Sequence, residues 1–205
     1  MSTQTILAAA SAARDAIHAR EADIEGLDRA IGDGDHYINI KRGADTVAAM
    51  AEELNDKPPS EVLKAIAMKL LSTIGGASGP LISSFFLAGA KTEGIDEPWT
   101  AETIARLVDD GTAAIAKRGK ASEGDKTMLD VLVPVARAMK ENTDKNAAAL
   151  RALAVETAEK GKDSTRDITA RFGRAAFLGE RAIGHIDPGA MSAYVIIKAI
   201  CEEAP

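Results

Sequence analysis

Apolar residues recur at spacings of three and four along most of this chain, and this periodicity constrains the fold more than any other feature. It indicates helices over residues 6–17, 47–54, 62–71, 81–90, 104–116, 128–139, 150–158 and 191–200. No stretch of alternating apolar and polar residues is long enough to predict a strand. We therefore expect an all-α fold of about eight helices, arranged as an antiparallel bundle or closed barrel.

Length and composition support one helical domain. The 205 residues suffice for one sizeable core, and no low-complexity linker divides them, so residues 1–205 are expected to form a single domain. Aromatic residues make up only 3% of the chain, which favours close helix packing over a β-sandwich. Ser60 and Thr100 follow prolines in turn segments and are predicted to cap the helices after them.

Charge and cysteine content exclude several classes of protein. Lys and Arg number 25 against 31 Asp and Glu, a net charge of −6, so the broad basic surface of a nucleic-acid-binding protein is absent from the sequence. Charged residues interrupt every apolar run before it reaches the length of a membrane span. The single cysteine, Cys201, cannot form an internal disulfide, and the N-terminal residues do not resemble a signal peptide. We therefore expect a cytoplasmic protein.

Residues 27–39 carry the strongest chemical signal. Asp28, Asp33 and Asp35 fall within eight positions. Gly32 precedes Asp33, and Gly34 lies between Asp33 and Asp35. Mg²⁺ prefers carboxylate and phosphate oxygens and usually keeps part of its coordination shell for substrate phosphates. A metal site that also binds a nucleotide is therefore indicated.

The expected geometry of this loop follows from an extended backbone. In such a segment Asp33 and Asp35 project from the same face, roughly 6 to 7 Å apart, and Asp28 at the end of a preceding short helix completes the ligand set. Two cations about 4 Å apart would then clamp phosphate oxygens, with His36 and Asn39 contacting a bridging phosphate. The alternative is an ordinary surface turn, because Asp and Gly are common turn residues.

Two further loops have the composition of ligand-binding segments. Residues 75–80 are rich in glycine, include Ser78 and lead into a predicted helix, whose N-terminus favours anions; tight helix packing is the alternative. The segment does not match the Walker A pattern. Residues 119–130 form a polar loop entering an apolar helix, where Met128 faces either an adenine ring or the core.

The C-terminal loop contains basic side chains and a turn. Arg171, Arg174 and Arg181 can reach phosphates bidentately, or can form a solvated face. Residues 187–189, Asp-Pro-Gly, are a turn signal. His185 is a base, a ligand or a hydrogen-bonded side chain at a helix end.

Taken together, these loops resemble those of a known family. The segments that carry the likeness are 31–36, 75–81, 124–130, 173–175 and 178–190. In this order they resemble the nucleotide-binding L subunit of bacterial dihydroxyacetone kinase, over residues 28–190. The resemblance implies an eight-helix barrel whose loops at one end hold two Mg²⁺ ions and an adenine nucleotide, ADP or ATP. It also implies that a separate K subunit holds the ketone substrate on a histidine.

The family pattern assigns roles to residues of this chain. It implies Asp28, Asp33 and Asp35 as metal ligands and assigns no catalytic residue. It implies nucleotide contacts at His36, Asn39, Ala77, Ser78, Gly119, Met128, Arg174, Asp187 and Gly189, and we add the adjoining Tyr37, Ile38 and Pro188. The chain departs from the family at Tyr37-Ile38, where a small residue is usual, so that the tyrosine narrows the phosphate pocket or stacks beside it. Ala176-Phe177 replaces a common Ser-Tyr.

The expected function is phosphoryl transfer to dihydroxyacetone or a related ketose. Either ATP binds and leaves as ADP, or ADP stays bound and an M phosphocarrier subunit fed by phosphoenolpyruvate rephosphorylates it; we favour the second scheme slightly. The alternative is a non-catalytic helical module that contacts a transcriptional regulator or holds an apolar ligand. A regulator contact can also coexist with catalysis. We further expect a homodimer and no nucleic-acid or membrane partner.

Overall fold

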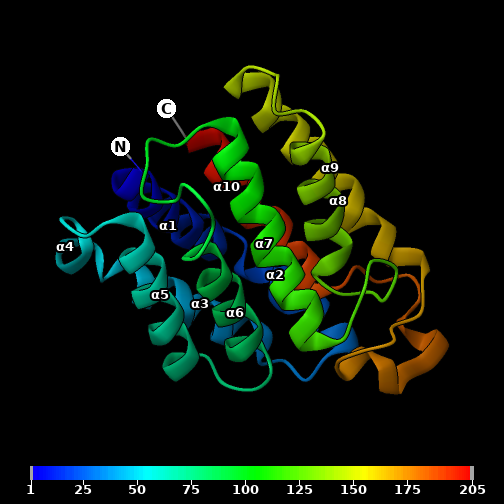
Figure 1. Ribbon diagram of the computed structural model, residues 1–205. Helices are drawn as coiled ribbons and strands as arrows, with labels where there is room; N and C mark the ends of the chain where they lie inside the picture. The colour runs from blue at the N-terminus through cyan, green and yellow to red at the C-terminus, as the bar shows by residue number, and fades with distance from the viewer. Residues whose placement is uncertain (1, 204–205) are drawn as a thin grey trace.

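The computed structural model describes residues 2–203, and within them the fold is entirely helical (Figure 1). The α-helices are α1 (Ser2–Ala19), α2 (Glu21–Ile31), α3 (His36–Ala48), α4 (Ala51–Leu54), α5 (Pro59–Thr73), α6 (Ser78–Gly89), α7 (Ala101–Gly119), α8 (Leu129–Lys140), α9 (Ala147–Ser164) and α10 (Pro188–Glu203). Two 3-10 segments, η1 (Thr165–Asp167) and η2 (Arg174–Ala182), precede α10. The all-α prediction is confirmed. None of these helices is long and apolar enough to cross a membrane.

Seven of the predicted helices lie inside observed helices or extend them by a residue, and the eighth is wrong. Residues 47–54 do not form one helix, because α3 ends at Ala48 and α4 begins at Ala51. The expected short helix around Asp28 is α2. The predicted count of eight is not confirmed, since nine helices of eleven residues or more occur in residues 2–203.

Of the two predicted helix caps, one is confirmed. The Thr100 side chain accepts a hydrogen bond from the Thr103 amide at the start of α7. Ser60 is not a cap, because Pro58 occupies that position at the start of α5. Instead, the amide and hydroxyl of Ser60 donate to the two carboxylate oxygens of Asp96, at 2.8 and 2.7 Å. This pair ties α5 to the loop before α7.

Neighbouring helices pack in a closed sequence. Each helix contacts the next in the order α1, α3, α5, α6, α7, α8, α9, α10, and α10 contacts α1 to close the ring. Helix α2 packs against both α3 and α10 (Figure 1). Small residues bring backbones together in this arrangement: a Cβ atom at Gly161 on α9 would lie 2.3 Å from the backbone oxygen of Asp130 on α8. The loops that connect these helices therefore start and end at packed helix termini.

The functional loops meet at one end of the ring, the lower end in Figure 1. Contacts between loops establish this arrangement. His36 at the start of α3 contacts Ser192 on α10, and a Cβ atom at Gly119 would lie 3.2 Å from Leu81 on α6. Met128 before α8 packs in the same cluster as Leu81. The N-termini of α3, α6, α8 and α10 therefore share this end with the C-termini of α2 and α7.

Candidate functional site

The three aspartates of the α2–α3 loop come together as a cluster. Asp28, Asp33 and Asp35 each offer a carboxylate oxygen, and these oxygens lie within 4.8 Å of one another. Asp28, in the last turn of α2, is 4% exposed, whereas the other two are exposed on the loop. Among the described residues this is the one group of three or more metal-ligating side chains at such spacing.

The backbone brings the three aspartates together through a turn, and not through the extended conformation that we predicted. Gly34 has a φ of +79°, in the left-handed region, and Asp35 is in the right-handed helical region. At Gly32 a Cβ atom would lie 1.8 Å from the Asp28 carboxylate, so only glycine leaves room for that side chain. The prediction of clustered aspartates is therefore consistent with the structure, but its geometric reason is wrong.

Two polar contacts orient the cluster. The backbone amide of His36 donates to Asp28 Oδ2 at 2.9 Å. The guanidinium of Arg174, at the start of η2, lies 2.7 Å from Asp33 Oδ2. One arginine offsets only one of the three negative charges, so the cluster keeps a net negative charge that suits a cation. Clustered carboxylate oxygens of this kind are the donor set that Mg²⁺ prefers, and the residues present fit that ion.

His36 links the cluster to the start of α10. Its Nε2 lies 2.8 Å from the Ser192 hydroxyl, and that hydroxyl donates to the Pro188 carbonyl oxygen at 2.9 Å. Because the hydroxyl has a single proton, Nε2 is the donor to Ser192. Burial lowers the pKa of His36, so the ring is neutral near pH 7. The imidazole is thereby fixed beside the cluster, and its contact with a nucleotide stays a prediction.

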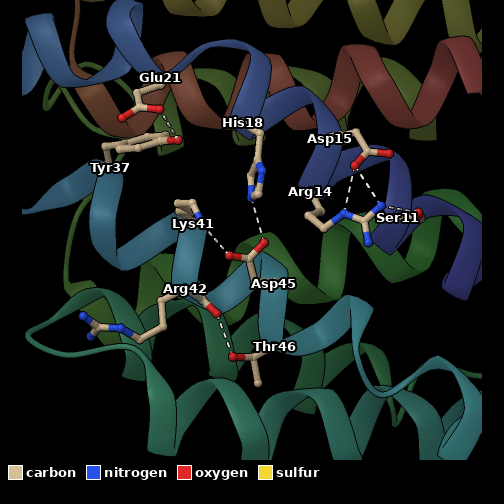
Figure 2. A network of polar contacts seen from close by, with 10 residues as sticks. All are labelled: Ser11, Arg14, Asp15, His18, Glu21, Tyr37, Lys41, Arg42, Asp45 and Thr46. Atoms are coloured by element: carbon tan, nitrogen blue, oxygen red, sulfur yellow. Dashed lines mark hydrogen bonds and ion pairs between the residues drawn. The ribbon is translucent and has the colours of Figure 1, made fainter.

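Tyr37 does not narrow a phosphate pocket, and the prediction that it does so or stacks there is wrong. The side chain is 4% exposed and packs with Ile17, Ile24 and Ile40. Its hydroxyl donates to Glu21 at the start of α2, at 3.1 Å, as Figure 2 shows. The ring is thus part of the core, and only its backbone remains a candidate contact.

Ile38, the residue after Tyr37, faces solvent and not the core. Ile38 is 53% exposed on the first turn of α3, so the sequence departure from the family places a large apolar side chain on the surface beside the cluster. Deeper in the same helix, Asp45 accepts contacts from Lys41 and from His18 on α1, at 2.6 and 2.7 Å (Figure 2). The His18 contact joins α3 to α1, and the Lys41 contact lies within α3.

The glycine-rich loop leads into α6 and lies next to α3. Ala77 is the residue before the helix and is exposed, and Ser78 is its half-buried first residue. A Cβ atom at Gly75 would lie 3.7 Å from Asn39 Oδ1, so this loop adjoins the first turn of α3. The first amides of a helix have no partner within it and carry a partial positive charge, so they suit an anion.

The loop before α8 and the turn before α10 meet each other. A Cβ atom at Gly189 would lie 3.6 Å from the Met128 amide nitrogen. Met128 is half-buried and packs against Ile115, Ala121 and Leu129, so it borders both the core and the loop end. Asp187 accepts a hydrogen bond from the Ala190 amide at 2.8 Å and caps α10. These contacts hold the loop before α8 against the turn before α10, at the end of the molecule where the functional loops meet.

Most of the predicted site residues therefore gather at one end of the molecule, and the Tyr37 ring is the exception. Three positions that hold this end together had no assigned role in the sequence: Ser192, Asp130 and Lys126. Asp130 accepts hydrogen bonds from the amides of Gly124 and Thr127, at 2.7 Å each. The only signal for Asp130 and Lys126 was their place in the 124–130 motif.

Two hollows of the surface lie away from the carboxylate cluster. One of about 470 Å³ lies between α9 and α10 and is lined in part by Arg151, Val155 and Cys201. Another of about 330 Å³ lies between α7 and α8, beside Thr112 and Lys140. Neither is lined by a predicted site residue. The carboxylate cluster itself lies at the surface, where Asp33 and Asp35 are exposed.

Comparison with known proteins places the chain in a family. Residues 30–202 match the DAK2 domain, and the chain belongs to this family. It is 41% identical over 179 residues to the ADP-binding subunit DhaL of the PEP-dependent dihydroxyacetone kinase of Escherichia coli, with 86% of this chain and 85% of the relative covered. The ADP-binding subunit DhaL of the PTS-dependent enzyme of Lactococcus lactis is 38% identical, with 91% and 90% covered.

Longer relatives contain the same domain as one part. The human triokinase/FMN cyclase is 34% identical over 89% of this chain, which spans 32% of that protein. The crystal structure of the dihydroxyacetone kinase from C. freundii in complex with AMP-PNP and Mg²⁺ superimposes with a TM-score of 0.74 at 26% identity. That match covers 96% of this chain and 33% of the kinase chain. The predicted resemblance is confirmed.

Asp187 generates a prediction about pH. Burial, with a further contribution from Asp130, raises the pKa of Asp187 from 3.8 to about 7. Between about pH 4 and pH 7 the folded protein keeps this proton and the unfolded chain loses it, so the group makes the free energy of unfolding fall as pH rises. The slope approaches about 1.4 kcal/mol per pH unit between the two pKa values, and it vanishes above about pH 8.

Urea unfolding of the wild type and Asp187→Asn, with a chelator present, tests this. Asparagine keeps an oxygen that accepts from the Ala190 amide but does not titrate, so the difference between the two proteins isolates the carboxyl group. The wild type should lose stability relative to the variant between pH 4.5 and 7, and the two should run parallel above pH 8. Parallel profiles throughout would contradict the raised pKa.

Proposed function

We propose that this chain is the nucleotide-binding subunit of a dihydroxyacetone-type kinase. It would serve the transfer of a phosphoryl group from a Mg-bound adenine nucleotide to a small hydroxyketone held on a separate K subunit. The observation that carries the proposal is the carboxylate cluster, with oxygens within 4.8 Å of one another, at the start of α3, whose first turn adjoins the glycine-rich loop before α6. Its relatives of similar length are named ADP-binding subunits of dihydroxyacetone kinase, which supports the same ligand here.

The chain's own residues divide the work of binding. Asp28, Asp33 and Asp35 would hold two Mg²⁺ ions, which neutralise phosphate charge when bound. Ser78 and the free amides at the start of α6 would donate to phosphate oxygens. Met128 and Gly189 would contact the base side of the nucleotide. The remaining predicted contacts surround these groups: His36, Asn39, Ala77, Gly119, Arg174, Asp187 and Pro188.

No residue of this chain is proposed as a nucleophile. Catalysis of phosphoryl transfer rests mainly on positioning and on stabilising charge, and both fit a subunit that holds only the nucleotide and its metals. The single domain over residues 1–205, the homodimer, the cytoplasmic location and a regulator contact stay predictions from the sequence. The non-catalytic module stays the rival hypothesis, and the next experiment separates the two.

Removing two ligands should abolish metal-dependent nucleotide binding. In the double variant Asp33→Asn, Asp35→Asn, we expect ADP affinity measured by calorimetry with Mg²⁺ to fall by about 100-fold or more, since charged ligands of a bound ion contribute several kcal/mol. A chelator should produce a similar loss in the wild type. Glu52→Gln, Glu53→Gln on α4 removes two exposed carboxylates away from the cluster and should bind normally. Unchanged binding in the first variant would leave only the non-catalytic module.

The comparisons also bear on the phosphoryl donor. The four relatives that this chain matches over 84–90% of their length are named PEP- or PTS-dependent. The triokinases and an L-erythrulose 1-kinase of Mycolicibacterium smegmatis are instead about three times as long, since this chain spans 32% of each. We therefore propose the scheme in which ADP remains bound and an M phosphocarrier subunit rephosphorylates it in place.

Reconstitution distinguishes the two donor schemes. With its K and M subunits and a phosphoenolpyruvate-fed phosphocarrier system, the chain should form phosphorylated ketose while labelled ADP stays bound through many turnovers. Omitting the M subunit should stop product formation. Product release from ATP at a similar rate with the K subunit alone, together with rapid ADP exchange, would refute the phosphocarrier scheme.

An apolar surface beside the cluster fits the contact with the K subunit. Phe177 on η2 is 84% exposed, and Phe172 and Ile183 flank the same segment at 37% and 44% exposure. Arg174 of this segment contacts Asp33, so the apolar surface adjoins the carboxylates. Exposed apolar patches of this kind mark protein interfaces. A K subunit docked here would bring its ketone to the open side of the metal site.

Shortening the most exposed of these side chains tests the contact. Phe177→Ser should weaken binding of the K subunit by about tenfold or more, as expected for an interface aromatic, and leave Mg²⁺-dependent ADP binding unchanged. Met68→Ser removes an apolar side chain of 54% exposure on α5, outside this surface, and should bind the K subunit normally. Equal K-subunit affinity in the wild type and Phe177→Ser would place the interface elsewhere.

A further inference from the structure

Lys126 is a lysine enclosed by the protein at the loop end. Its side chain is 1% exposed, in the loop between α7 and α8. The Nζ atom donates to the backbone oxygens of Thr165 at 2.5 Å, His185 at 2.6 Å and Arg166 at 3.4 Å. One ammonium group thus joins the loop before α8 to η1 and to the segment leading into α10.

The acceptors around Lys126 match the chemistry of an ammonium group. Such a group has three donors and no acceptor, and three carbonyl oxygens surround it here. Burial lowers the pKa of Lys126, and nearby Asp187, Asp167 and Asp130 oppose that shift. The residue also has a φ of +60°, a backbone conformation that non-glycine residues rarely adopt. Core packing alone would favour an apolar side chain at this position.

Further hydrogen bonds strengthen the connection on the side of α10. The Gly184 amide donates to the Arg166 oxygen at 2.8 Å, and the Asp187 amide donates to the Thr165 hydroxyl at 3.0 Å. The segment before α10 is therefore held against η1 by backbone contacts. Lys126 connects both η1 and the segment before α10 to the loop before α8.

The two loops joined by Lys126 carry the base-side residues of the proposed nucleotide site. Met128 follows Lys126 by two positions, and Asp187 follows His185 by two. The two loops touch where Gly189 approaches the Met128 amide. Lys126 itself is buried away from solvent, so we expect it to contact neither the nucleotide nor its metals.

We propose that Lys126 is a positioning residue: its ammonium group sets the separation of Met128 from the Asp187–Gly189 turn and so shapes the surface that receives the nucleotide base. The identity of the ligand rests on the proposed function, whereas the link between the loops does not. The carboxylate cluster at the phosphate side has no contact with Lys126 and should keep its geometry without it.

Lys126→Met tests this role, because it removes the donors and keeps a long apolar side chain. We expect the Kd for Mg-ADP to rise tenfold or more, while the Kd for Mg-pyrophosphate, which lacks the base, changes less than twofold. Lys140→Met removes an exposed lysine paired with Asp109 on α7 and should leave both values unchanged. Lys126→Gln, which keeps an amide donor, is the second variant should Lys126→Met fail to fold.

Amide hydrogen exchange supplies a readout that needs no nucleotide. In the Lys126 variants, exchange at Gly184 and Asp187 should accelerate tenfold or more relative to the core of α5. Unchanged exchange and ADP affinity would overturn the proposal, and so would equal losses of ADP and pyrophosphate binding, which indicate general destabilisation. A wild type that binds no ADP would refute the proposed function, and the exchange rates would still decide the role of Lys126.

Discussion

The repulsion among three carboxylates is the constraint on which the functional end of this protein depends. Asp28 is buried in the last turn of α2, and the turn through Gly32 and Gly34 returns Asp33 and Asp35 to it. Like charges oppose this close approach, so the surrounding structure has to hold the three side chains in place. The closed sequence of packed helices supplies that support, and the salt bridge from Arg174 relieves only part of the repulsion.

Helix ends complement the carboxylates. The N-termini of α3, α6, α8 and α10 lie at the same end, and each carries a partial positive charge from the helix dipole. A surface with clustered carboxylates and several helix N-termini attracts a divalent cation and an anion together. A magnesium nucleotide combines both in one ligand, which explains why neither feature alone was decisive in the sequence.

The sequence predicted what short-range pattern encodes. The periodicity placed most of the helices, and the spacing of Asp28, Asp33 and Asp35 predicted their cluster. It failed where the outcome depends on packing: no helix was predicted over residues 36–46, yet α3 begins at His36 and Tyr37 lies in the core. The salt bridge of Arg174 to Asp33 and the contacts of Lys126 join distant segments, and no local pattern encodes such pairs.

The exposed carboxylate cluster and the hydrogen-bonded loops before α8 and α10 suit the proposed role of this chain as one half of a catalytic unit. Buried contacts through Lys126 and Asp130 fix the loops that would receive the nucleotide, so little ordering entropy is lost when it binds. The phosphate side is left uncovered, and the exposed Phe177 lies beside it. A site that faces outward exposes a reactive phosphoryl group to water unless a second surface closes over it. Docking of the K subunit would therefore both deliver the acceptor and exclude water.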